Sequence, residues 1–251
     1  NSEAYIQSDS VFYKGYRTNL AQRVAEAAEA ADAYQALLAI SKTQDSIKES
    51  TGLYAVLQQE IVRLEEEIAY SRSLGMNVEA SETICAEAAQ VYAEQHYDDA
   101  NTQKLIERLR EAAHTQAYNF LAGDGTEADP YLIVRPTQLE NMHNVLKQDT
   151  MVYFRLNKDI DMSGMEWIPL NGSAAKYRYR IDFDGQGHLI RNLTMANEGY
   201  PSFFGTLCGN CRNVGFVNAK VVSTTSAAAV LAGNVGHSSY EDADGNILPC
   251  K

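Results

Sequence analysis

Residues 123–133 read Gly-Asp-Gly-Thr-Glu-Ala-Asp-Pro-Tyr-Leu-Ile, and residues 183–195 read Phe-Asp-Gly-Gln-Gly-His-Leu-Ile-Arg-Asn-Leu-Thr-Met. Short apolar runs separated by Gly and Asn corners are typical of a coiled parallel sheet. The pattern also recurs, because residues 190–195, Ile-Arg-Asn-Leu-Thr-Met, are similar to residues 211–216, Cys-Arg-Asn-Val-Gly-Phe. The sequence therefore predicts a parallel β-helix in this part of the chain.

The repeat also predicts which residues stack in neighbouring turns of the β-helix. Aligning the two similar segments places Asn192 above Asn213 at a corner, where Asn tolerates left-handed backbone geometry and its amide can stack. A looser similarity pairs residues 204–207, Phe-Gly-Thr-Leu, with residues 232–235, Ala-Gly-Asn-Val. The uneven spacing of these repeats indicates that loops project from some turns.

Alternation of apolar and polar residues indicates strands with one buried face. The apolar members of three such segments are Val152, Phe154 and Leu156, then Ile160 and Met162, then Ile181 and Phe183. A short helix is expected to start at Pro136, with Thr137 and Glu140 forming a capping box. Its apolar side is suited to cover the first turn of the β-helix. That side comprises Leu139, Met142, Val145 and Leu146.

The chain before residue 123 is predicted to be helical. All 5 prolines and most of the 16 glycines lie after residue 122, so helix breakers are concentrated in the second half. One predicted helix has its apolar residues at helical spacing on one face; they are Leu53, Leu57, Ile61, Leu64 and Ile68. Further helices are predicted at residues 8–44, 78–96 and 100–121, and we expect their apolar faces to pack as a slender bundle.

Composition and charge limit the classes of partner. The formal net charge is -12, and a surface this acidic repels phosphate backbones, so we expect no nucleic-acid partner. No stretch approaches the roughly 18 consecutive apolar residues that span a bilayer, and the sequence does not begin like a secretory signal. The chain is therefore expected to be soluble, without a transmembrane segment.

Two pairs of carboxylates are the main candidates for chemistry: Asp159 with Asp161, and Asp182 with Asp184. Residues i and i+2 of a strand face the same way, so each pair could hold a cation or work as acid and base. The alternative interpretation is structural. Asp161 and Asp184 would then end strands, since Asp184 is followed by Gly in a turn-forming dipeptide.

No catalytic, metal-binding or cofactor motif accompanies these carboxylates. The 5 histidines are isolated, and phosphate loops, dinucleotide fingerprints and Gly-x-Ser-x-Gly are absent from the sequence, so we predict no catalytic residue, metal site or cofactor. Residues 159–164 resemble half of a calcium loop, but Leu170 stands where the last ligand should be Glu. Cys208 and Cys211 form a Cys-x-x-Cys motif. The repeat gives Cys211 the inward position of Ile190, which favours a buried thiol, and a disulfide between the two cysteines is the alternative.

Aromatic and basic residues provide the best candidates for ligand binding. They are Trp167, Tyr177 and Tyr179, with Arg178 and Arg180 beside the tyrosines. Tyr177 and Tyr179 would share a face of an extended strand, and flat aromatic rings beside hydrogen-bonding Arg suit a sugar or an acidic polymer. The alternative is an exposed strand edge or loop with ordinary amphipathic side chains.

Residues 123–237 resemble the β-helical repeat region of secreted and surface-attached bacterial proteins that carry the GLUG motif. The matching segments occur in order: 129–133 (Asp-Pro-Tyr-Leu-Ile), 153–161 (Tyr-Phe-Arg-Leu-Asn-Lys-Asp-Ile-Asp), 183–190, 203–205 (Phe-Phe-Gly) and 231–236 (Leu-Ala-Gly-Asn-Val-Gly). The helical part resembles small three-helix modules of bacterial surface proteins. This resemblance implies export, an extracellular or cell-envelope location, and a role in adhesion or glycan contact. The expected strand after Gly236 is missing, so we expect further turns beyond residue 251.

The predicted fold is α+β and multidomain. Residues 1–122 are expected to form an all-α helical bundle, and residues 123–251 a right-handed parallel β-helix, a pectin-lyase-like solenoid, with an N-terminal cap helix. The expected function is that of a non-catalytic, adhesin-like surface protein. Its bundle would be a spacer, and its β-helix would present a face to a glycan or to a host or cell-surface protein. The alternatives are a polysaccharide lyase or glycoside hydrolase that uses the four aspartates, and a structural scaffold without a ligand.

Overall fold

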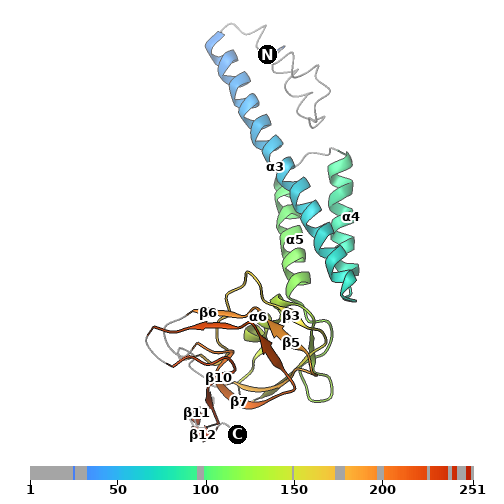
Figure 1. Ribbon diagram of the computed structural model, residues 1–251. Helices are drawn as coiled ribbons and strands as arrows, with labels where there is room; N and C mark the ends of the chain where they lie inside the picture. Colours follow the sequence, from blue (N-terminus) through green and yellow to red (C-terminus); the bar gives the residue numbers. More distant parts are fainter. Residues whose placement is uncertain are drawn as a thin grey trace. The chain divides into compact units, whose positions relative to one another are not determined.

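The computed structural model describes residues 25, 33–94, 99–148, 150–172, 179–196, 201–224, 227–236, 239–241 and 247–249 (Figure 1). The chain divides into two compact units. The helical unit comprises the residues up to Ser73 together with Asn77–Gln116, and the sheet unit comprises Leu74–Met76 together with the residues from Ala117 onward. The predicted order, a helical region followed by parallel strands, is confirmed. Among the described residues, no helix has the length and apolar character needed to cross a bilayer.

The described residues of the helical unit form three helices, α3 (Ala33–Ser73), α4 (Glu79–Glu94) and α5 (Asp99–Tyr118). The predicted apolar face of α3 is confirmed, since Leu57 and Leu64 are fully buried against side chains of the other two helices. α3 ends before Gly75, whose φ of +80° suits glycine in a helix-terminating turn.

The predicted helix at residues 8–44 is wrong in its C-terminal boundary. Residues 33–44 belong to α3, which continues without interruption to Ser73, because no Pro lies in this stretch and its Gly52 remains helical. Of the remaining predicted residues, all but Ala25 lie outside the described part of the chain.

In the sheet unit, the part that the structure describes contains one helix and short strands. The elements up to the middle of the unit are β1 (Tyr131–Ile133), α6 (Pro136–Val145), β2 (Met151–Leu156), β3 (Ile160–Asp161), β4 (Arg180–Asp184), β5 (Leu189–Arg191) and β6 (Thr194–Ala196). They are followed by β7 (Phe204–Arg212), β8 (Gly215–Val217), β9 (Lys220–Val222), β10 (Ala232–Val235), β11 (Ser239–Glu241) and β12 (Ile247–Pro249).

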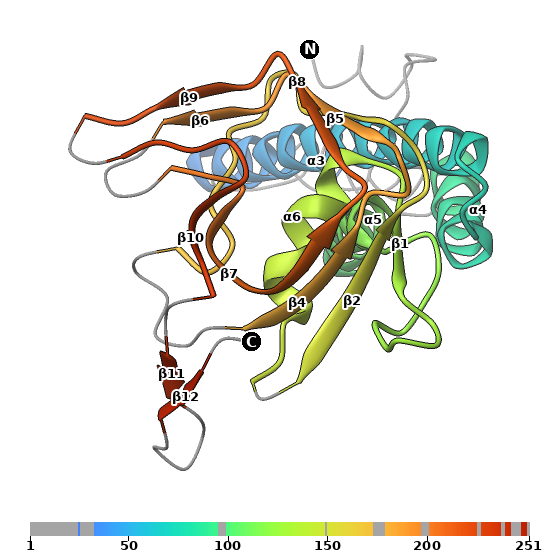
Figure 2. The same cartoon turned by 60° about the horizontal axis from the view of Figure 1, so that its bottom comes forward.

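These strands form three parallel sheets, with the order β1-β2-β4-β7-β10, β3-β5-β8 and β6-β9 (Figure 2). From β4 the chain passes through the three sheets in turn, as β4, β5 and β6, and then repeats the same order as β7, β8 and β9 before it enters β10. Each pass therefore adds one strand to each sheet. β11 and β12 differ, since they form a separate antiparallel pair.

The register of the parallel strands confirms one predicted repeat and corrects the other. Residues 232–235 pair with residues 204–207, as the looser similarity predicts. The alignment of residues 190–195 with residues 211–216 is wrong. Ile190 pairs with Phe216, whereas Cys211 lies in a different sheet, where it pairs with Phe183.

The corner residues show the same shift. Asn192 and Asn213 both have the predicted left-handed φ, 56° and 53°, but they do not stack on each other. Asn192 instead accepts a hydrogen bond of 2.6 Å from the side chain of Asn218, which follows β8. Asn213 follows β7 and donates its side-chain hydrogen bond to Asp184. The two asparagines thus occupy different corners of the strand path.

The core of the sheet unit is built from the predicted alternating residues. Val152, Phe154 and Leu156 of β2, together with Ile181 and Phe183 of β4, are almost completely buried. The aromatic rings of Phe183, Phe203 and Phe204 meet edge to face, with centroids 4.8 to 6.0 Å apart. Apolar burial of this kind is the main stabilising contribution to the unit.

Helix α6 packs on this core through the predicted apolar side, with Leu139 and Met142 fully buried. The predicted capping box is displaced. Gln138 Oε1, rather than a Glu140 oxygen, accepts the hydrogen bond from the backbone N–H of Arg135, at 3.2 Å. Glu140 instead accepts a hydrogen bond from the Tyr118 hydroxyl at 3.1 Å. The N-cap of the helix is therefore Arg135, two residues before the predicted N-cap Thr137.

Candidate ligand-binding surface

The four candidate carboxylates lie in two different sheets. Asp182 and Asp184 belong to β4 of the five-stranded sheet, whereas Asp161 ends β3 of the three-stranded sheet and Asp159 precedes it. Each pair contacts side chains of neighbouring strands, so the pairs form two networks. Within the described ranges, no three His, Cys, Asp or Glu side chains are placed to hold a metal ion together.

The first network lies on the face of the five-stranded sheet opposite the core. Because Phe183 points into the core, Asp182 and Asp184 point to the other face. The register places Asn210 beside Asp182 and Arg212 beside Asp184. Both carboxylate residues are only 6% exposed. The side chains of β7 therefore cover the carboxylates on this face.

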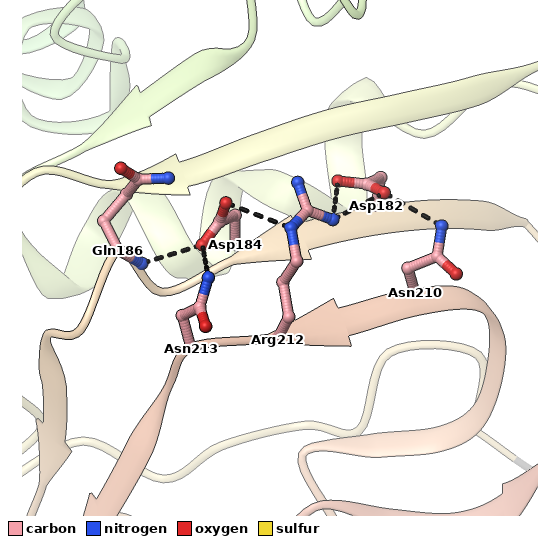
Figure 3. A network of polar contacts seen from close by, with 6 residues as sticks. All are labelled: Asp182, Asp184, Gln186, Asn210, Arg212 and Asn213. Atoms are coloured by element: carbon pink, nitrogen blue, oxygen red, sulfur yellow. Dashed lines mark hydrogen bonds and ion pairs between the residues drawn. The ribbon is translucent and has the colours of Figure 1, made fainter.

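Arg212 links the two carboxylates (Figure 3). Its Nη1 atom donates to both oxygens of Asp182 at 2.8 and 2.9 Å, and its Nε atom donates to Asp184 Oδ2 at 3.1 Å. Asn210 Nδ2 donates to Asp182 Oδ2 at 3.0 Å, and Asn213 Nδ2 donates to Asp184 Oδ1 at 3.1 Å. The network therefore fixes the position of an arginine that is 43% exposed in its side chain.

Asp184 is held in its ionised form. Burial alone would raise its pKa, but hydrogen bonds from the backbone N–H of Gln186 and the Asn213 side chain, with the charge of Arg212, outweigh burial and lower the pKa below its ordinary value. Hydrogen bonding to Asp182 raises the pKa of Arg212. A general acid in glycoside cleavage needs a raised pKa. The shift at Asp184 has the opposite sign.

The second network joins β3 to β5. Asp159 accepts hydrogen bonds from the backbone N–H of Leu189 at 3.0 Å and from Arg191 Nη2 at 3.1 Å, and both contacts lower its pKa. Asp161 accepts from the Ser163 hydroxyl at 2.6 Å and from Asn192 Nδ2 at 2.8 Å, which lowers its pKa as well. These bonds tie one strand to the next, which supports the structural interpretation of both aspartates.

The polar face of the five-stranded sheet continues onto β2. Tyr153 pairs with Asp182, and Arg155 pairs with Asp184. Arg180, at the start of β4, is two residues before Asp182 and so lies on the same side of the sheet as Asp182 and Asp184. We call this surface the outer face and define it by seven residues: Tyr153, Arg155, Arg180, Asp182, Asp184, Asn210 and Arg212.

Among the residues that the structure describes, two arginines of the outer face have no counterion within ion-pair distance. Arg155 and Arg180 are half-buried, and neither forms a hydrogen bond or an ion pair in the described part of the chain. Burial, with the negative charges of Glu127 and Asp182, raises the pKa of Tyr153, so its phenol is neutral at physiological pH. The outer face thus presents two arginines that are not engaged in ion pairs with described residues, next to a neutral aromatic ring.

The predicted binding residues have different positions in the structure. Trp167 is only 2% exposed, its ring stacks on Phe203 at 4.7 Å, and its Nε1 atom donates to Phe203 O at 2.9 Å. It is a core residue, so the prediction that it contacts a ligand is corrected: its indole is large, apolar and satisfied by a backbone carbonyl. Tyr177 and Arg178 lie outside the described residues.

Tyr179 and Arg180 are both half-buried. The backbone of Tyr179 is held by Asn171, whose side-chain oxygen accepts from the Tyr179 N–H at 2.9 Å and whose Nδ2 donates to the Tyr179 carbonyl at 2.7 Å. Asn171 is buried and also donates to Thr206 O at 3.1 Å. These bonds fix the start of β4, and therefore the position from which Arg180 projects.

The Cys-x-x-Cys motif does not form a local disulfide. Cys208 is disulfide-bonded, whereas Cys211 is a free, partly buried thiol. Burial raises the pKa of Cys211 to about 11, so it carries almost no thiolate at neutral pH. Cys211 is therefore a free and partly buried thiol, in line with the prediction of a buried one. Its neighbour in the adjacent strand is Phe183 and not the predicted Ile190.

Sequence reasoning missed four members of the outer face: Tyr153, Arg155, Asn210 and Arg212. Alternation along residues 151–156 already assigns Tyr153 and Arg155 to the side away from the core. Nothing local assigns Asn210 and Arg212, because their positions depend on the pairing of β7 with β4. The missing information was therefore the strand register.

Comparisons with known proteins give partial matches. No family model matches the chain. A protein of Evansella cellulosilytica, provisionally named a Gly-rich membrane protein, is 27% identical, and the match covers 36% of this chain and 14% of that protein. A crystal structure of a Bacteroides ovatus protein, provisionally named an immunoglobulin A1 protease, is 50% identical, with a TM-score of 0.44, and the match covers 46% of this chain and 34% of that one. The chain thus spans less than two thirds of either protein.

Proposed function

We propose that this chain is a non-catalytic binding protein of the bacterial cell exterior, whose sheet unit winds as a right-handed parallel β-helix and presents its outer face to a glycan. The repeated passage through three parallel sheets supports the winding, because each pass pairs in register with the one before it. In such a fold the helical unit would serve as a spacer. Extended solenoid faces bind extended partners.

The observation that carries the proposal is the fixed arrangement of the outer face. Arg212 is held by two carboxylates, which are themselves held by Asn210 and Asn213. Side chains that are already immobilised lose little conformational entropy when a ligand binds. The face combines charged and amide groups with the ring of Tyr153, which is the combination that sugar recognition uses.

Two further observations support a location outside the cytoplasm. Cys208 is disulfide-bonded, and disulfides persist mainly in oxidising compartments. The Evansella protein carries the name of a membrane protein, which is compatible with attachment of this chain to the cell envelope. We therefore retain the extracellular or cell-surface location as part of the proposal.

The polysaccharide-degrading alternative has weaker support. A glycosidase needs two carboxylates across one bond, one of them with a raised pKa. The four candidate aspartates belong to two networks, and the pKa of Asp159, Asp161 and Asp184 is lowered. The scaffold alternative predicts no ligand and is separated from our proposal by a binding assay.

The test is a glycan array probed with the full chain, combined with an assay for new reducing ends and for unsaturated products. We expect binding without product formation, and binding that weakens in the Arg212→Ala variant. Product formation that disappears in Asp184→Asn, with Trp167 emission unchanged, would instead establish the enzyme. Absence of both binding and product would support the scaffold.

A further inference from the structure

We propose that the outer face binds an acidic polysaccharide that lies along the direction of β2 and β4, with Arg155 and Arg180 contacting its anionic groups. This inference rests on the proposed glycan-binding function, and it adds the chemical class of the glycan and its orientation.

The charge balance separates the three arginines of the outer face. Arg212 is paired with both Asp182 and Asp184, through contacts of 2.8 to 3.1 Å, so this cluster keeps one negative charge. Arg155 and Arg180 have no such counterions in the described part of the chain. In a protein with a net charge of -12, the outer face stands out, because its three arginines exceed its two aspartates by one positive charge. Guanidinium binds carboxylate and sulfate groups through paired hydrogen bonds.

The spacing of these cations favours an extended ligand. Arg180 pairs with Met151 and Asp184 pairs with Arg155, so four residues separate the two arginine positions along the strands. At about 3.3 Å per residue, this is about 13 Å. Tyr153 occupies the midpoint, opposite Asp182. Two anionic groups with a sugar ring between them match this order of cation, aromatic ring and cation better than one small anion does.

The sheet topology favours a polysaccharide over an acidic peptide. Peptides gain much of their affinity on sheets by adding a strand at an exposed edge, but β2, β4 and β7 are interior strands, flanked on both sides in the order β1-β2-β4-β7-β10. Their backbone groups are therefore used within the sheet. Side-chain groups are therefore the ones that can contact a ligand on this face. Asn210 is exposed and donates a hydrogen bond from Nδ2 to Asp182, so its side-chain carbonyl oxygen can accept a hydrogen bond from a sugar hydroxyl.

The experiment measures binding of the full chain to immobilised polygalacturonate and alginate, with dextran as the neutral polysaccharide and poly-glutamate as the acidic peptide. We expect binding to the two uronate polymers that weakens with added salt. Arg155→Ala and Arg180→Ala should each weaken it about fivefold, and the double variant about 25-fold. Lys220→Ala is the matched control, because it removes one positive charge from β9, which belongs to a different sheet, and it should leave binding unchanged.

A variant that removes a negative charge near the outer face should have the opposite effect on binding. The charge of the exposed Glu127 acts on Tyr153 at the margin of the outer face, so Glu127→Gln should strengthen binding of the uronate polymers. Emission of Trp167 checks that each variant is folded. Equal binding of dextran, or of poly-glutamate, overturns the acidic-polysaccharide assignment but leaves glycan binding or protein binding standing. No binding to any polysaccharide, on these probes or on the array, overturns the proposed function as well.

Discussion

Replacing Arg212 by alanine tests whether the network on the outer face is a structural tie between β4 and β7. The change leaves Asp182 and Asp184 without their cation, although both remain covered to 6% exposure. Breaking a fully buried ion pair by removing one partner costs about 3–5 kcal/mol. Because the Arg212 side chain is 43% exposed, solvent screening reduces this cost, and we expect a loss of about 2 kcal/mol in the free energy of unfolding at pH 7.

Arg191→Ala is the matched control. The Arg191 side chain is 41% exposed, almost as much as that of Arg212, but its partner Asp159 is 43% exposed, whereas Asp182 and Asp184 have 9% and 8% exposed side chains. Water can replace Arg191 at an exposed carboxylate, so its removal should change stability far less. The two variants match in residue type and in arginine exposure, and they differ in the burial and the number of the carboxylates, two for Arg212 and one for Arg191.

The dependence on pH has a definite sign. The folded-state pKa of Asp184 is lowered, so the stability that it contributes is present above its unfolded pKa of about 3.9 and is lost as pH falls through the folded value. Arg212→Ala removes part of this lowering. The difference in stability between the native chain and the variant should therefore be largest at pH 6–7 and should shrink below about pH 4.

Urea unfolding followed by tryptophan fluorescence measures these differences, because the chain has 1 Trp and it is buried in the core of the sheet unit. The signal reports that unit and not the helical one. Equal losses for Arg212→Ala and Arg191→Ala at pH 7 would refute the reasoning about burial. A difference that grows toward pH 3 would refute the assignment of an ionised, stabilised Asp184.

Three further predictions concern the corners and the free thiol. Gly185→Ala should unfold or strongly destabilise the sheet unit, because a Cβ at this position would lie 2.4 Å from Asn213 O, and loss of the cooperative tryptophan transition is the readout. Asn192→Ala should lower the free energy of unfolding by about 2 kcal/mol in urea, because the φ of Asn192 is 56° and its side chain accepts a hydrogen bond from Asn218. Asn192→Gly should lower it less, because Gly adopts this φ readily. Equal losses for the two variants would exclude backbone strain as the cause. Alkylation of Cys211 by iodoacetamide should be slow at pH 8 and accelerate toward pH 11, which peptide mass mapping measures; rapid labelling at pH 7 would contradict its burial.

Local patterns predicted much of the core. The apolar spacing in residues 53–68 identified the buried face of α3, and alternation in residues 152–156 and 181–183 identified the buried faces of β2 and β4. Both patterns report on which side of an element is apolar, and that property depends only on neighbours in the sequence. Trp167 shows the limit of such reasoning, since a lone aromatic in a turn-rich segment gives no period that assigns it to a face.

The outer face depended on information that no local pattern contains. Asp182 and Asp184 could be recognised as a pair from the alternation of β4, but the interpretation of that pair depends on what lies beside it. The register of β7 places Asn210 and Arg212 beside the two aspartates. Their hydrogen bonds make a hydrogen-bonded, ion-paired network of two carboxylates that could have formed a catalytic site. A shift of two residues in that register would place different side chains over the aspartates.

The error in the predicted stacking of residues 190–195 on residues 211–216 has a specific cause. Asn192 and Asn213 follow the ends of β5 and β7, and both take the left-handed backbone that a corner requires. The chain turns more than once in each pass through the three sheets, so one pass contains more than one corner. The two segments are therefore similar because both contain an asparagine corner, although the corners are different ones. The segments that do pair are less alike: residues 190–192, Ile-Arg-Asn, meet residues 216–218, Phe-Val-Asn, and residues 204–207 meet the smaller residues 232–235. In a chain of this kind, similarity between asparagine corners identifies where strands end, and the register has to be derived from the length of a whole pass.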